Sequence, residues 1–183
     1  MTRAHVIDGW RIDVTVRPGV PRVLSGAECA RVVVAALSAA EAPRPAALSV
    51  ILSDDDELAD LNATHFGHAG PTDVLSFPLL SPDAFPPHPG GASISRPVSG
   101  PFVPPPRARP HLGDIAVSVE RAIAQASEGR GGQTGDVGSD AASELRLLLT
   151  HGTLHVCGWD HAEPQEEKAM RALEGRLLGD ARP

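Results

Sequence analysis

Residues 151–161 read HGTLHVCGWDH and place three histidines in one short segment. His151 and His155 lie four positions apart, so a helix presents both imidazoles on one face. Gly158 readily adopts a left-handed backbone conformation and is expected to end that helix. The chain then turns and brings His161 back toward the same face. The segment therefore predicts a helix and a tight turn that together bring three imidazoles to one point.

Three neutral imidazoles are a typical ligand set for a divalent transition metal, and zinc fits them best. A His-x-x-x-His pair alone also occurs by chance, so the prediction depends on His161, which follows the glycine. Three protein ligands leave one coordination position open for water or substrate, which indicates a catalytic site with one zinc ion per chain. Cys157 lies off the stripe formed by His151 and His155, and we expect it to pack as a small apolar residue behind the metal helix.

The composition is that of a globular protein, and we expect one domain that spans residues 1–183. The chain has 183 residues, of which 42% are hydrophobic and 21% are charged. The formal net charge of -7 argues against strong non-specific binding to nucleic acid, and no DNA partner is expected. An RNA partner would need a local basic patch or a larger assembly that delivers it.

Cysteine usage and hydropathy indicate the compartment. Cys29 and Cys157 are far apart and do not form the framework of a disulfide-rich secreted protein, which fits a reducing cytoplasm. We see no charged-then-apolar leader at the amino terminus, and no apolar run approaches the ~18 residues of a membrane span. A cytoplasmic protein without a membrane partner is expected.

Hydrophobic patterning predicts strands and helices in alternation, with two loops rich in Pro, Gly and Ser. The expected strands are Val6–Val16, Ala47–Leu52, Val74–Phe77 and Leu112–Val119. The expected helices are Ala27–Ala40, a helix capped by Ser53 with Asp54, Asp55 and Asp56 in its first turn, Glu120–Glu128, the metal helix capped by Ser139 or Asp140, and Glu166–Leu178. We expect the loops near 80–111 and 129–138 to be flexible surface insertions.

This order of elements predicts an α+β domain with a small mixed sheet packed against helices. The strand at 47–52 is flanked by helices, which favours a parallel crossover, whereas the strands at 74 and 112 are expected to pair antiparallel. In the metal helix the packing side is formed by Leu145, Leu148, Leu149 and Gly152.

Four segments of the chain together resemble the YbeY family of metal-dependent endoribonucleases, also called ribosomal RNA maturation factors. They are Leu48–Asn62, PTDVLSFP at 71–78, LGDI at 112–115 and the HGxLHxxGxDH pattern at 151–161. The last pattern is highly specific, and PTDVLSFP is nearly as specific. The match covers most of the chain from about residue 47 onward.

The resemblance implies a mixed four-stranded sheet, a zincin-like core, and a zinc ion held by His151, His155 and His161. It also implies a cytoplasmic, zinc-dependent, single-strand-specific endoribonuclease that acts in ribosomal RNA processing, ribosome maturation and quality control. The implied partners are ribosomal RNA and the ribosome or its small subunit.

One position departs from the family pattern. After the segment that ends at Asn62, the family usually has an aromatic residue and then an arginine that faces the metal cleft. In this sequence the two positions are His65 and Phe66. The resemblance implies that this arginine engages RNA phosphate, so Phe66 would remove that contact. His65 and His68 are candidates to replace it at lower charge.

The residues allow three hypotheses for function, of which the first is a metal-dependent endoribonuclease. The metal would bind a scissile phosphate oxygen as a Lewis acid, or would lower the pKa of its water to about 7 so that hydroxide attacks. Attack by the RNA 2′-OH would need no metal-bound water. The sequence does not choose between these routes.

The second hypothesis is a zinc peptidase, and the third is a ribosome assembly factor that binds metal without catalysis. Zinc peptidases with His-x-x-x-His carry a glutamate beside the first histidine as general base. That position is Gly152 here, which argues against proteolysis. Phe66 in the place of an arginine gives weight to the assembly factor.

Several carboxylates are candidates to orient an imidazole, each with a plainer alternative. Glu144 lies two turns before His151, where an exposed ion pair with an arginine is the alternative. Asp160 precedes the third histidine, where a hydrogen bond within the turn is the alternative. Asp114 follows a strand glycine, where a local hydrogen bond at the strand is the alternative.

The PTDVLSFP block supplies further candidates, because in the family it lines the cleft. Thr72, Asp73 and Ser76 are therefore possible substrate contacts, although Thr-Asp after proline also forms a turn. The arginines available to bind phosphate are Arg107, Arg109, Arg121 and Arg146. Ordinary solvated charge is the alternative for each of them.

Overall fold

The computed structural model describes residues 1–89, 109–128 and 140–179. The strands are β1 (Thr2–Ile7), β2 (Trp10–Val16), β3 (Ala46–Ser53), β4 (Val74–Pro78) and β5 (His111–Ser118). The helices are α1 (Gly26–Ala39), α2 (Asp55–Phe66), α3 (Val119–Glu128), α4 (Ala141–Val156), α5 (Pro164–Leu178) and the short 3-10 helix η1 (Pro82–Ala84). The prediction of an α+β fold is confirmed.

The sheet has five strands in the order β1-β2-β3-β5-β4. The three central strands, β2, β3 and β5, are parallel to one another. The two edge strands, β1 and β4, are each antiparallel to their neighbour. The parallel crossover at β3 and the antiparallel pairing of β4 with β5 are therefore confirmed.

The expected four-stranded sheet is wrong by one strand. The stretch Val6–Val16, predicted as one strand, contains the end of β1, a turn and all of β2, and the two strands form a hairpin. Asp8 and Gly9 make the turn, both with positive φ (+49° and +91°). Asp-Gly is the typical dipeptide of such a two-residue hairpin turn, so the sequence itself indicates a hairpin at this position.

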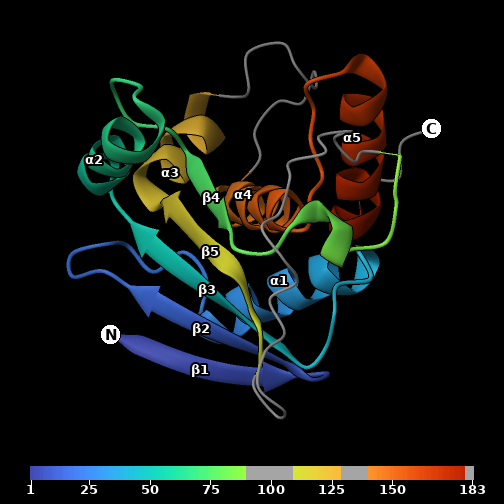
Figure 1. Ribbon diagram of the computed structural model, residues 1–183. Coiled ribbons are helices and arrows are strands. Elements are labelled where there is room, and N and C mark those ends of the chain that lie inside the picture. Colours follow the sequence, from blue (N-terminus) through green and yellow to red (C-terminus); the bar gives the residue numbers. More distant parts are fainter. Residues whose placement is uncertain (90–108, 129–139, 180–183) are drawn as a thin grey trace.

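Helices cover both faces of the sheet (Figure 1). On one face α1, α4 and α5 contribute to the main core with the inward side chains of β2, β3 and β5. On the other face α2 packs through Leu58, which forms a smaller cluster with Leu75 of β4 and Ala116 of β5. The edge strand β4 therefore lies between α2 and α4, and this position determines where the site forms.

The start of α2 differs in detail from expectation. Asp54, rather than Ser53, is the N-cap, because its carboxylate accepts the backbone N–H of Glu57 at 2.9 Å. Ser53 is the last residue of β3, and its hydroxyl donates to the Glu57 carboxylate. The acidic residues that follow Asp54 occupy the first turn of the helix, where the helix dipole favours negative charge.

The long loop after β4 is not wholly a surface insertion. Leu80 and Phe85 pack against the main core, and Phe85 is only 6% exposed. Residues 90–108 of that expected loop lie outside the described residues, as do the whole of the expected loop near 129–138 and Ser139. In the described part of the chain, no helix is long and apolar enough to cross a membrane.

Candidate metal centre

Helix α4 lies close against the sheet because Gly152 has no side chain. A Cβ built at this position would lie 2.9 Å from Ile115 Cγ2 and 3.0 Å from Val74 Cγ2. Ser76 adds a bond across the same contact, since its hydroxyl donates to the Gly152 carbonyl oxygen at 3.0 Å. As expected, Leu145, Leu148 and Leu149 are buried on the packing side of the helix. The absence of a side chain at Gly152 therefore sets the distance between α4 and the strands β4 and β5.

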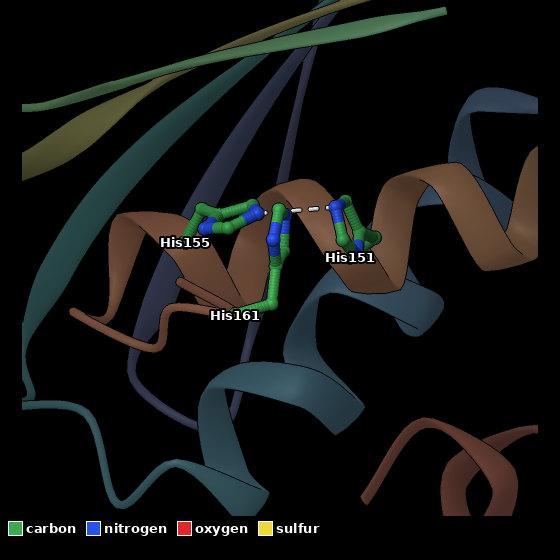
Figure 2. Close-up of side chains that lie close together, drawn as sticks. All are labelled: His151, His155 and His161. Carbon is green, nitrogen blue, oxygen red and sulfur yellow. Dashed lines mark hydrogen bonds between the residues drawn. The ribbon is translucent and has the colours of Figure 1, made fainter. Parts of the chain in front are cut away.

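The three histidines converge as the sequence predicts (Figure 2). His151 and His155 extend from α4, and His161 reaches them from the segment that follows. The Nε2 atoms of His151 and His155 lie 3.0 Å apart, and one nitrogen from each of the three rings lies within 4.8 Å of the others. Gly158 has a φ of +83° just after α4, which confirms its expected role in the turn.

The residues fit a metal ion. Tetrahedral zinc bound at about 2.0–2.1 Å places two nitrogen ligands roughly 3.3 Å apart, close to the spacing of His151 and His155. Burial, together with the neighbouring His151 and His161, lowers the pKa of His155 to about 4. His155 is therefore neutral near pH 7, and the neutral imidazole is the form that binds metal.

Hydrogen bonds on the outer nitrogens orient two of the rings. The Nδ1 atom of His151 lies 2.7 Å from Glu174 Oε1 of α5, and Nδ1 of His155 lies 2.9 Å from the Trp159 carbonyl oxygen. Because both acceptors require a proton on Nδ1, the Nε2 lone pairs face the shared point. Such outer partners set the tautomer of metal-binding histidines in general.

Glu174 is the one residue of this arrangement that sequence reasoning missed. It lies 23 positions after His151, and it is 9% exposed. Met170, one helical turn before it, and the adjacent Leu173 are buried core residues. A glutamate on the apolar face of an amphipathic helix was the signal that could have identified it.

A pocket of about 590 Å³ surrounds the histidines. It follows the outer edge of the sheet, so that β4 contributes one wall. The lining residues are Phe66, Thr72, Asp73, Val74, Leu75, Ser76, Pro78, Pro82, His151, His155, Gly158, Trp159, Asp160 and His161. The site is therefore open to a ligand large enough to reach from the histidines to the end of α2.

The chain matches the family model described as endoribonuclease YbeY over residues 24–182. The chain belongs to the YbeY family. An endoribonuclease YbeY of Roseiflexus castenholzii is 34% identical over 169 residues, which cover 92% of this chain and 91% of that protein. One of Nocardia farcinica is 43% identical over 135 residues, which cover 73% of this chain and 61% of that protein.

A third relative and one solved structure are also similar to this chain. The endoribonuclease YbeY of Salinispora tropica is 40% identical over 75% of both chains. A solution structure of a Thermotoga maritima protein aligns over 91% of this chain with a TM-score of 0.47 and 20% identity. Membership of the YbeY family supports an enzyme that hydrolyses RNA.

The candidates from the PTDVLSFP block line the pocket, but their polar groups have local partners. Asp73 accepts the backbone N–H of Val74 at 2.9 Å and the amide of Gln125 at 3.2 Å. The Thr72 hydroxyl lies 3.3 Å from the same carboxylate, and Ser76 bonds to Gly152. These residues thus shape the wall of the YbeY pocket through a turn and a helix contact.

The three carboxylate candidates lie in different environments. Asp160 lines the pocket, and its carboxylate accepts the backbone N–H of His161 at 2.7 Å, which is the expected bond within the turn. Asp114 does not line the pocket and bonds instead to His111 at 2.8 Å. Glu144 is 2% exposed and also lies outside the pocket lining, so its carboxylate is buried and not at the exposed surface that the alternative required.

The described lining of the pocket contains no lysine or arginine. Arg121 forms an ion pair with Asp55 at 3.1 Å, and Arg109 reaches the Gly9 carbonyl oxygen at 3.5 Å. Arg146 is not among the lining residues, and Arg107 lies outside the described residues. Phe66 does line the pocket and is 46% exposed. His65 and His68 are exposed and do not appear in the lining.

Proposed function

We propose that this protein is a zinc-dependent, single-strand-specific endoribonuclease that acts on ribosomal RNA. The observation that carries the proposal is the convergence of three imidazoles in an open pocket, with the outer nitrogens of two rings already bonded. Membership of the YbeY family supplies the substrate class. Ribosome maturation and quality control, in the cytoplasm, are the processes we assign to it.

In this proposal His151, His155 and His161 hold zinc. When bound, the ion would supply Lewis acidity toward a phosphate oxygen or toward a water molecule. Glu174 and the Trp159 carbonyl oxygen keep two rings oriented with Nε2 toward the ion. Asp160 stabilises the turn that presents His161. The chain's own contribution is therefore a rigid, oriented ligand set beside an open channel along β4.

Charge suggests that a larger assembly delivers the RNA. The chain carries a formal net charge of -7, and the described pocket lining includes the carboxylates Asp73 and Asp160. Phosphate contacts made by these lining residues alone would be weak. The ribosome or its small subunit is thus the partner we propose.

The peptidase hypothesis loses support from the packing of α4. A peptidase of this type needs a glutamate where Gly152 stands. Gly152 faces Ile115, Val74 and Ser76 at contact distance, so a side chain there would meet the sheet rather than the pocket.

Cleavage of a labelled single-stranded ribosomal RNA fragment by protein of measured zinc content tests the proposal. We expect cleavage with one zinc per chain and its loss with a chelator, restored by added zinc. A parallel reaction with isolated small ribosomal subunits tests the need for an assembly. Fully zinc-loaded protein that cleaves neither substrate but binds the subunit would overturn the nuclease and favour the assembly factor, which the exposed Phe66 makes the second candidate.

Substitution of Glu174 by glutamine tests the proposed orientation of His151. The amide keeps the size of the side chain and an acceptor oxygen, but it removes the negative charge that strengthens the hydrogen bond from Nδ1. We expect zinc affinity to fall by about 10- to 100-fold, as measured by competition with a chromogenic chelator. Glu167→Gln is the matched control, because Glu167 lies on the same helix and pairs with Arg171 instead. Equal affinity in the two variants would contradict the role given to Glu174.

A further inference from the structure

Phe66 is an exposed aromatic side chain on the rim of the metal pocket. It is the last residue of α2, and 46% of its surface is exposed. The chain has only four phenylalanines, of which Phe85 is buried at 6% exposure. Among the exposed large apolar side chains of the described residues, which are Met1, Val6, Phe66 and Leu79, Phe66 is the one that lines the pocket, so its ring is placed to contact a ligand there.

The Phe66 ring is supported on one side. Its centroid lies 5.7 Å from that of Phe77 at an interplanar angle of 45°. His65 contacts the same Phe77 edge-on, with centroids 5.2 Å apart. Phe77 belongs to β4, the strand that forms a wall of the pocket. Phe66 is thus anchored against the sheet edge while nearly half of its surface faces outward.

A ligand at the three histidines would pass Phe66. The ring and the histidines line the same pocket, which follows the edge of the sheet from the end of α2 to α4. The described lining offers no lysine or arginine there to bind phosphate. Affinity for RNA that the described lining supplies at this end must therefore come from an interaction that does not depend on lysine or arginine side chains.

We propose that Phe66 stacks on an unpaired base of the RNA next to the cleavage point and so sets the selectivity for single strands. This rests on the proposed function, and it names the residue that reads the substrate. Every base has a π face, so stacking tolerates any sequence. Bases within a duplex are already stacked on their neighbours, so only a single-stranded segment can offer one.

Binding of a single-stranded RNA of about eight nucleotides to the zinc-loaded protein tests the proposal, with RNA integrity checked on a gel. The RNA carries one 2-aminopurine, whose fluorescence falls when the base stacks. We expect Phe66→Ala to weaken binding between about 5-fold and 150-fold and to remove the quenching. Phe66→Trp should keep both. Val6→Ala is the matched control, because Val6 is 64% exposed on the opposite edge strand.

Two further arms separate stacking from other causes. Phe66→Leu keeps an apolar side chain without a π face, and we expect it to behave like Phe66→Ala. A single abasic site moved along the RNA should reveal one position at which Phe66→Ala causes no additional loss. The proposal is overturned if Phe66→Ala or Phe66→Leu binds RNA as tightly as the unchanged protein, as it would if Phe66 contacted a protein partner. If the unchanged protein does not bind the free RNA, the same variants are compared on the isolated small ribosomal subunit, and binding to neither substrate fails the proposed function, which is a separate result.

Discussion

The substitution His155→Ala is expected to abolish zinc binding and RNA cleavage together. His155 contributes one nitrogen of the cluster, 3.0 Å from that of His151, and its ring is oriented by the Trp159 carbonyl oxygen. Loss of an orienting partner alone costs about 10- to 100-fold in metal affinity or activity, so loss of a ligand should exceed about 100-fold. Zinc content by mass spectrometry and the cleavage rate of a labelled RNA are the two measurements.

His111→Ala is the control for this experiment. His111 is also a partly buried histidine, but it pairs with Asp114 on β5 and is not among the residues that line the pocket. We expect it to keep zinc and activity. Retention of both properties by His155→Ala would contradict the metal centre. Loss of zinc in His155→Ala, with no cleavage by the unchanged protein, would retain the centre and reject the enzyme.

The cluster of three histidines could be predicted because its residues are close in sequence. The spacing of His151 and His155 and the turn at Gly158 depend on one helix and its end, and both follow from residue type. The partner of His151 depends on how α5 docks, which is a tertiary event. Glu174 could be recognised only as a charged residue on an apolar helix face, a signal that does not say which histidine it meets.

The fold shows the same division between local and non-local information. Strand pairing across β4 and β5 and the parallel crossover at β3 follow from element order and are observed. The hairpin at Asp8 and Gly9 was missed because apolar residues lie directly on both sides of the turn, although the dipeptide itself is informative. The burial of Glu144 could not be predicted, since it depends on elements distant in sequence that pack around the start of α4.

The second large effect is expected at Gly152, where two opposing contributions can be compared. Alanine in a helix interior gains about 1 kcal/mol over glycine. Against this, the new Cβ would lie 2.9 Å from Ile115 Cγ2, 3.0 Å from Val74 Cγ2 and 3.2 Å from Ser76 Oγ. Insertion of a methyl group into a packed core costs about 1–3 kcal/mol. Because the new Cβ makes three close contacts at once, the packing cost should lie toward the upper end of that range. After the helix-propensity gain is subtracted, we expect Gly152→Ala to lower the free energy of unfolding by about 1–2 kcal/mol.

The control and the consequence for the site follow from the same geometry. Gly175→Ala, in the interior of α5, measures the helix-propensity gain away from the sheet contact and should stabilise or be neutral. Gly152→Glu, the peptidase-like substitution, must also bury a carboxylate and should fail to fold, because that cost adds several kcal/mol. Chemical denaturation gives the stabilities.

Gly152→Ala should also weaken zinc binding, because α4 must move away from β4 and carries both His151 and His155 with it. A stable Gly152→Glu variant with peptidase activity would reverse the assignment of this helix to an RNA-cleaving site.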